Sequence, residues 1–162
     1  RKRHHWPPTP APSLIDPMRL TTFSDYSLRV LIYLAAEPDR RATIAEIAQA
    51  FGISENHLMK VVHFLGKQGW LRNVRGKGGG MELAHAPAEI RLGAVVRACE
   101  TQLPAECFDR ETNRCVITPV CKLKHVLAEA SAAMYATLDK YTLEDISANR
   151  RALSKILLMQ VA

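Results

Sequence analysis

The stretch TIAEIAQAFGISENHLMKVVHFLGK, residues 43–67, decides the fold of this chain. Thr43 and Glu46 form a capping-box pattern, which predicts that a short helix begins after Thr43. A turn that contains Gly52 follows. Ser54 is then a suitable N-cap for a second helix, which continues to the end of the quoted stretch. Two short helices separated by a turn of this kind predict a helix-turn-helix.

The flanking segments extend this motif to a winged-helix domain over residues 18–100. Apolar residues at helical spacing predict a preceding helix over 23–36. After the motif, two strand candidates at 70–74 and 81–84 enclose the basic loop RGKGGG. Helices followed by a β-hairpin predict a winged helix, and a further helix over 91–100 closes the domain.

The rest of the chain predicts a loop over 101–121 and two helices within 122–162. One is a long helix over 122–138, and the other is a closing helix over 143–159. An apolar stripe follows the long helix at Leu123, Val126, Leu127, Ala130, Met134 and Leu138. Such a stripe packs either in the chain's own core or against a second copy of the chain. We favour the second copy, so the predicted fold is a mainly α-helical winged helix-turn-helix with a C-terminal dimerisation helix.

The first seventeen residues, RKRHHWPPTPAPSLIDP, differ in composition from the rest. They hold five of the nine prolines in the chain. We interpret 1–17 as a disordered leader or a non-native extension, with a nucleic-acid-binding arm as the alternative. The whole chain has a net charge of +6, and without this segment about +4 remains. The basic character, which favours an anionic partner, therefore belongs to the main part of the chain.

Composition and pattern exclude several classes of protein. The length of 162 residues suits one domain, or a small domain with an extension. No apolar run reaches about eighteen residues and no signal-peptide pattern is present, so we expect a cytoplasmic protein that does not enter a membrane. In that compartment, clustered cysteines bind metal more readily than they form disulfides. No nucleophile–base motif is present, so we expect no enzymatic activity.

The expected DNA-binding surface lies on the second helix of the motif and on the wing. Between positions 57 and 80 the chain carries five basic and no acidic residues. Such a face suits contact with phosphates. Ser54, Asn56, His57 and Lys60 are the candidates for base edges in the major groove. Arg75 and Lys77 at the wing tip suit a minor-groove or backbone contact. A solvated charged face, or a winged helix that binds protein, is the alternative.

Three cysteines in the predicted loop form the second candidate site. Cys107, Cys115 and Cys121 have the spacing C-x7-C-x5-C, which lacks the tight knuckles of zinc sites. A loop of this length fits a [2Fe–2S] or [4Fe–4S] cluster better, with unligated thiols or a redox-sensing pair as alternatives. Cys99 is expected to be a buried core residue. His125 is expected on a helix surface, with ligation as the alternative.

Several motifs together resemble the Rrf-type iron–sulfur winged-helix regulators. They are MRLTTFSDYSLRVLIYLA (18–35), HLMKVV (57–62), RGKGGG (75–80) and the three-cysteine loop. CVITPVCKLKHVL (115–127) and LDKYTLEDI (138–146) are similar to the nitric-oxide-sensing repressors of that family. The resemblance implies a homodimer that binds a double-stranded DNA operator and releases it when nitric oxide attacks the cluster.

The resemblance also implies a ligand set for the cluster. The three cysteines would hold one cluster in each subunit, and Asp25 of the partner subunit would supply the fourth ligand. The alternative for Asp25 is an acidic residue favoured by the helix dipole, in an ordinary intrahelical pair with Arg29. Cluster-biogenesis regulators of the same family place a histidine soon after the third cysteine. Here His125 comes one place late. A regulator of iron–sulfur status or of general redox state is therefore the alternative function.

Overall fold

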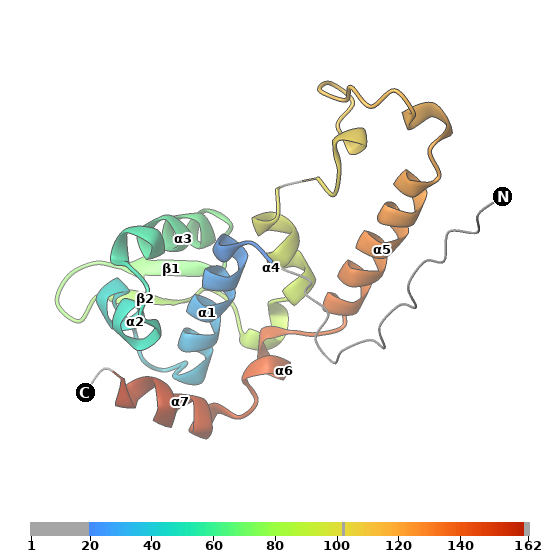
Figure 1. Cartoon of the computed structure of the whole chain (residues 1–162). Coiled ribbons are helices and arrows are strands. Elements are labelled where there is room, and N and C mark those ends of the chain that lie inside the picture. Colours follow the sequence, from blue (N-terminus) through green and yellow to red (C-terminus); the bar gives the residue numbers. More distant parts are fainter. Residues whose placement is uncertain (1–19, 102, 161–162) are drawn as a thin grey trace, which may run out of the picture.

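The computed structural model describes residues 20–101 and 103–160, so the leader expected at 1–17 lies outside the described residues. A helical body carries one β-hairpin, and a loop with one long helix projects from that body (Figure 1). The mainly α-helical class is confirmed. The helices and strands are α1 (Thr22–Ala36), α2 (Ile44–Phe51), α3 (Glu55–Lys67), β1 (Leu71–Val74), β2 (Gly80–Leu83), α4 (Leu92–Cys99), α5 (Leu123–Leu138), α6 (Leu143–Ser147) and α7 (Arg150–Met159).

The helix-turn-helix forms where its capping residues predict it. The Thr43 hydroxyl accepts the backbone N–H of Glu46 at 3.2 Å, and the Glu46 carboxylate accepts that of Thr43 at 2.6 Å. Gly52 ends α2 in the left-handed conformation, with φ of 62°. The Ser54 hydroxyl then caps α3 by accepting the backbone N–H of His57 at 3.4 Å. These local hydrogen bonds set the direction in which α3 leaves the turn.

The wing is a two-stranded antiparallel hairpin in which Asn73 pairs with Met81. Met81 also exchanges backbone hydrogen bonds with Ala42, at 2.8 and 3.1 Å, which fastens the hairpin to the segment before α2. A Cβ atom at Gly79 would lie 2.4 Å from the carbonyl oxygen of Val74. Only glycine fits that close approach, so the glycine run is a requirement of the turn.

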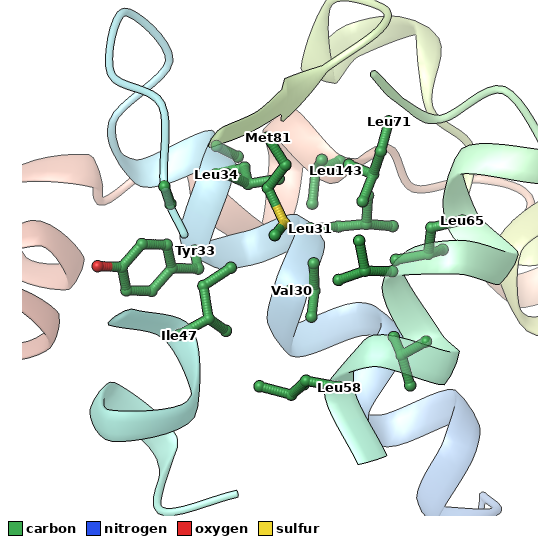
Figure 2. Packing of buried hydrophobic residues seen from close by; sticks show 14 of the residues in the cluster. Val30, Leu31, Tyr33, Leu34, Ile47, Leu58, Leu65, Leu71, Met81 and Leu143 are labelled. Carbon is green, nitrogen blue, oxygen red and sulfur yellow. The ribbon is translucent and has the colours of Figure 1, made fainter. Parts of the chain in front are cut away.

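Figure 2 shows the core, in which α1 is surrounded by apolar side chains from the other elements. Val30 and Leu31 of α1 are completely buried, as are Leu58 and Leu65 of α3. Leu143 of α6 is also fully buried and joins the same cluster, although it lies far along the chain. The C-terminal segment therefore returns to complete the core of the winged helix.

The closing helix is divided, which differs from the single helix predicted over 143–159. Helix α6 ends at Ser147 and α7 begins at Arg150. Leu143 and Leu157 are both buried in the core. In one straight helix, fourteen residues would separate them by about 21 Å along the axis. The break at 148–149 lets both side chains reach α1, a tertiary requirement that helical spacing alone does not express.

Residues 103–138 form a projecting arm that consists of the cysteine loop and α5 (Figure 1). Within the described residues, no position between Cys99 and Leu143 belongs to the core cluster. Helix α5 has no buried residue, and Leu123 and Val126 are each 59% exposed. The first part of the apolar stripe, at Leu123 and Val126, is thus not covered by the chain's own core. Among the described helices, none combines the length and the hydropathy that crossing a membrane demands.

Candidate DNA interface and cysteine loop

Helix α3 presents the predicted base-contacting residues on its open face. Four apolar side chains (Leu58, Val61, Val62 and Leu65) anchor the opposite face in the core. Ser54, Asn56, His57 and Lys60 are all exposed at the beginning of the helix. Val62 is 4% exposed and therefore faces the core, not the DNA. The helix is therefore held from behind while its first turns stay open to a ligand.

Sequence reasoning missed two residues of this open face. Met59 is 50% exposed on the same side of the helix. His63 is also exposed. Asn56, Met59, Lys60 and His63 follow the helical spacing i, i+3, i+4, i+7. Counting that spacing from Asn56 would have assigned both residues to the same face.

The wing carries fewer free cations than its sequence indicates. Glu82 of β2 accepts hydrogen bonds from Arg72 at 2.6 Å and from Arg41 at 2.9 Å. Hydrogen bonds from Arg41 first, then from Arg72, lower the pKa of the Glu82 carboxyl. Glu82 lies just beyond the acid-free stretch, so the sequence window concealed this pair. Arg75 and Lys77 are exposed at the tip, and neither belongs to an ion pair within the described part of the chain.

Asp25 lies in the first turn of α1. Its carboxylate accepts hydrogen bonds from the Arg29 guanidinium, with distances of 3.1 Å from Nε and 2.9 Å from Nη2. The Arg29 guanidinium also lies 5.8 Å from the ring centre of Phe51. The intrahelical pair predicted as the alternative role of Asp25 is thus formed. Both side chains stay more than 40% exposed, so the pair is accessible from outside.

The cysteine loop is built from local turns. Asp109 accepts backbone N–H groups from Glu111 and Thr112, and Asn113 accepts that of Cys115 at 3.0 Å. Cys107, Cys115 and Cys121 are partly buried free thiols. Within residues 20–101 and 103–160, no three histidine, cysteine or acidic side chains are gathered as a metal would require. The loop therefore places the three thiols on one segment but does not draw them together.

The donor set nevertheless fits an iron–sulfur cluster. Three thiols supply the soft ligands that such clusters require. None of them is used in a disulfide, and the core does not hold the loop in its present conformation. Cys99, in contrast, is only 7% exposed on α4, which confirms the expected core position. Burial is the main cause that raises the pKa of its thiol, so this cysteine is a poor metal ligand.

The projecting arm is attached to the body close to both of its ends. Just before the arm, the Glu100 carboxylate accepts the Ser24 hydroxyl at 2.6 Å and the Thr21 backbone N–H at 2.8 Å. Just after α5, Asp139 accepts a hydrogen bond from Arg97 at 2.9 Å. Arg97 also lies 4.7 Å from the ring centre of Tyr135. The loop and α5 are thus joined to α1 and α4 by polar contacts at two points.

A helix-turn-helix with an open second helix, followed by a basic hairpin, defines a winged-helix protein. The model of the Rrf2 family, described as iron-dependent transcriptional regulator, matches residues 20–149. The chain belongs to the Rrf2 family.

Sequence similarity to individual proteins specifies the type of Rrf2-family regulator. The HTH-type transcriptional regulator NsrR of Bacillus subtilis (strain 168) is 51% identical over 145 residues, which cover 88% of this chain and 99% of that protein. NsrR of Geobacillus kaustophilus (strain HTA426) is 47% identical over 142 residues, which cover 86% of this chain and 97% of that protein. The chain is accordingly a transcriptional regulator of the NsrR type, not an enzyme.

Solved structures agree with the fold. T. potens IscR superposes with a TM-score of 0.67 at 26% identity, over 82% of this chain and 88% of that chain. CymR, the global cysteine regulator of B. subtilis, superposes with a TM-score of 0.62 at 24% identity, over 82% of this chain and 98% of that chain. These similarities confirm the winged-helix architecture predicted from the sequence.

Proposed function

We propose that the protein is a homodimeric, cytoplasmic repressor that binds a DNA operator and releases it in response to nitric oxide. An iron–sulfur cluster, of the [4Fe–4S] or [2Fe–2S] type, would be the sensor. The observation that carries this proposal is the position of all three loop cysteines on an arm outside the core. A segment that the core does not fasten can change conformation without unfolding the DNA-binding domain.

Three features of the surface support binding to double-stranded DNA. The exposed residues at the beginning of α3 (Ser54, Asn56, His57 and Lys60) present amide, hydroxyl and cationic donors, which pair with base edges in a major groove. The core behind α3 fixes the orientation of these donors. Arg75 and Lys77 project at the wing tip, where they would contact the phosphate backbone or the minor groove.

The exposed stripe of α5 supports a homodimer. Leu123 and Val126 are each 59% exposed in the single chain, and no residue of α5 is buried within it. Two copies of α5 that pack along this stripe would remove it from water. A two-fold dimer would also present two α3 helices to successive turns of the DNA, which matches the geometry of helix-turn-helix operators.

Cys107, Cys115 and Cys121 would hold the cluster, and Asp25 of the partner subunit would complete its ligand set. The bound cluster supplies an iron that reacts with nitric oxide. A carboxylate is a weaker ligand than a thiolate, so the Asp25 position would be the more reactive one. Asp25 is already partly exposed and paired with Arg29. Arg29 would therefore orient the carboxylate when the partner's loop approaches.

The chain's own contacts suggest how a change in the loop reaches the DNA-binding surface. Glu100 connects the start of the loop to the N-terminus of α1 through Thr21 and Ser24. Helix α1 packs against α3 in the core. A rearrangement of the loop would thus act on α1 from its own subunit at Glu100 and from the partner at Asp25. A decisive switch requires affinities for the two states that differ by several kcal/mol.

A regulator of iron–sulfur status is the second candidate function. The structural similarity to T. potens IscR favours it. His125 is exposed at the beginning of α5, four residues after Cys121, so a histidine ligand is available near the loop. The two candidates differ in their input: a nitric-oxide sensor responds to the gas at constant cluster content, whereas a status sensor responds to loading of the cluster.

Anaerobic reconstitution tests the proposal directly. The wild-type protein should bind iron and sulfide, show visible absorption and lose DNA affinity as nitric oxide is added. Replacing Cys107, Cys115 and Cys121 with Ser should abolish the absorption. Cys99→Ala is the matched control and should keep it. A colourless wild-type protein whose DNA affinity ignores iron and nitric oxide would contradict the proposal. Release of DNA on cluster loss alone, with no response to nitric oxide, would favour the status sensor.

A further inference from the structure

A cleft of about 330 Å³ lies between the beginning of α1 and the beginning of α3. Helices α1 and α3 pack against each other within the body (Figure 1). Two of the residues that line the cleft, His57 and Lys60, already belong to the candidate DNA interface. The lining residues are Thr22, Phe23, Tyr26, His57, Lys60 and Val61.

The floor of the cleft is apolar and held in place by the core. Val61 is 1% exposed. The Phe23 ring packs edge-on against Phe64 of α3, with 5.1 Å between the ring centres. The contact between Phe23 and Phe64 joins α1 to α3, so the floor is fixed before any ligand arrives.

The rim of the cleft is polar and cationic. Thr22 and Tyr26 each carry a hydroxyl group, and His57 and Lys60 carry N–H donors. The Tyr26 and His57 rings lie 6.4 Å apart, which spans the gap between the helices. Lys60 is exposed and belongs to no ion pair within the described residues. The cleft thus combines an apolar floor with donors and an unneutralised cation at its edge.

We propose that this cleft seats the sugar–phosphate backbone of the operator, with Thr22 and Tyr26 of α1 as DNA contacts. A deoxyribose is apolar on its face and would cover the floor, while the adjacent phosphate would meet the hydroxyl and N–H donors at the rim. The chemistry of the rim complements an anion, and the cleft continues directly into the face of α3.

This assignment changes the role expected for Lys60. As part of the cleft, Lys60 binds a phosphate and not a guanine edge. The assignment also places the DNA backbone and the partner's cluster against the same part of α1, because Asp25 lies between Thr22 and Tyr26 along the helix. Residues 22, 25 and 26 share one face at helical spacing. One turn of α1 would therefore face both the partner's cysteine loop and the DNA.

The inference depends on the proposed DNA binding, and its test separates the two. The probes are a duplex that the cluster-loaded wild-type protein selects from a random pool, and poly(dA-dT) as non-specific DNA. Tyr26→Phe removes only the hydroxyl and should weaken binding of the dimer to both probes at least about a hundredfold, because each subunit loses one hydrogen bond to a charged group. Lys60→Gln should weaken both and lower the slope of log affinity against log salt by about two, one for each subunit. Tyr141→Phe, a tyrosine exposed outside α1 and α3, is the matched control and should bind like wild type.

Each outcome decides between defined alternatives. Wild-type protein that binds neither probe contradicts the proposed function itself. Wild-type binding with unchanged affinity in Tyr26→Phe and Lys60→Gln overturns the backbone seat alone. Loss confined to the selected duplex overturns it too, because that result makes Lys60 a base contact. Sedimentation velocity of each variant measures its dimerisation. Weaker dimerisation with unchanged DNA affinity per dimer would mean that the partner's loop occupies the cleft. That result would also overturn the proposal.

Discussion

Replacing Val126 with Asp should dissociate the dimer without unfolding the subunit. Val126 is 59% exposed on α5, in the part of the apolar stripe that the core leaves uncovered. Complete burial of such a side chain contributes about 1.5–3 kcal/mol. The exposed fraction leaves about 1–2 kcal/mol for the partner to supply, and a symmetric dimer contains the contact twice. The loss is therefore about 2–4 kcal/mol, which raises the dimer dissociation constant at least about thirtyfold.

Sedimentation velocity over a range of protein concentrations measures that constant directly. Ile156→Asp is the matched control, because Ile156 is 61% exposed on α7, which packs on the body. It should leave the constant unchanged. Both variants should unfold in urea within about 0.5 kcal/mol of wild type, as expected for exposed positions. A Val126→Asp protein that stays dimeric, or an Ile156→Asp protein that dissociates instead, would refute α5 as the dimer seam.

Three further changes test the body of the protein. Leu143→Ala removes a fully buried side chain from α6 and should lower the free energy of unfolding by about 2–5 kcal/mol in urea titration; a loss below about 1 kcal/mol would show that α6 does not close the core. Gly79→Ala places a Cβ 2.4 Å from the Val74 carbonyl oxygen, so gel-shift affinity for DNA should fall while urea unfolding of the helical core changes little; wild-type affinity would mean that the wing does not contact DNA. Glu100→Gln should reduce the gain in stability between acidic and neutral pH, measured as urea midpoints at several pH values, and an unchanged pH profile would argue against its contacts.

The sign of the Glu100 effect follows from its surroundings. Burial alone would raise the pKa of the carboxyl, but hydrogen bonds from the Ser24 hydroxyl and from Thr21 together lower it below the ordinary value of 4.5. A group whose pKa is lower in the folded state contributes stability above its unfolded pKa, and that contribution is lost as the pH falls through the folded value. In wild type, the loss should therefore begin below about pH 4.5.

Local signals predicted the local structure well. The capping box at Thr43 and the N-cap at Ser54 set α2 and α3 because each acts within three residues of itself. The run RGKGGG was predicted as a loop between two strands, and it connects β1 to β2. Helical spacing of apolar residues also predicted α5, which spans Leu123–Leu138.

Contacts between distant segments were beyond the reach of such patterns. The break between α6 and α7 follows from the need to bury both Leu143 and Leu157. The pairing of Arg72 with Glu82 depends on the register of the hairpin, which a count of charges does not include. The cleft beside Tyr26 exists only because α1 and α3 are packed together. Ligation of the cluster by the three loop cysteines and by Asp25 in trans depends on how two chains meet, which spacing along one chain does not express.

The hydrophobic core closes without the projecting arm, and the subunit can therefore stay folded after it has responded to nitric oxide. The hydrophobic cluster runs from α1 to α4 and resumes at Leu143, so its completion does not depend on the cysteine loop. On the proposed function, a subunit that loses its cluster keeps the hydrophobic core that holds its DNA-binding helices together. The regulator can then be reloaded and used again, and recovery from an exposure to nitric oxide requires new clusters instead of new protein.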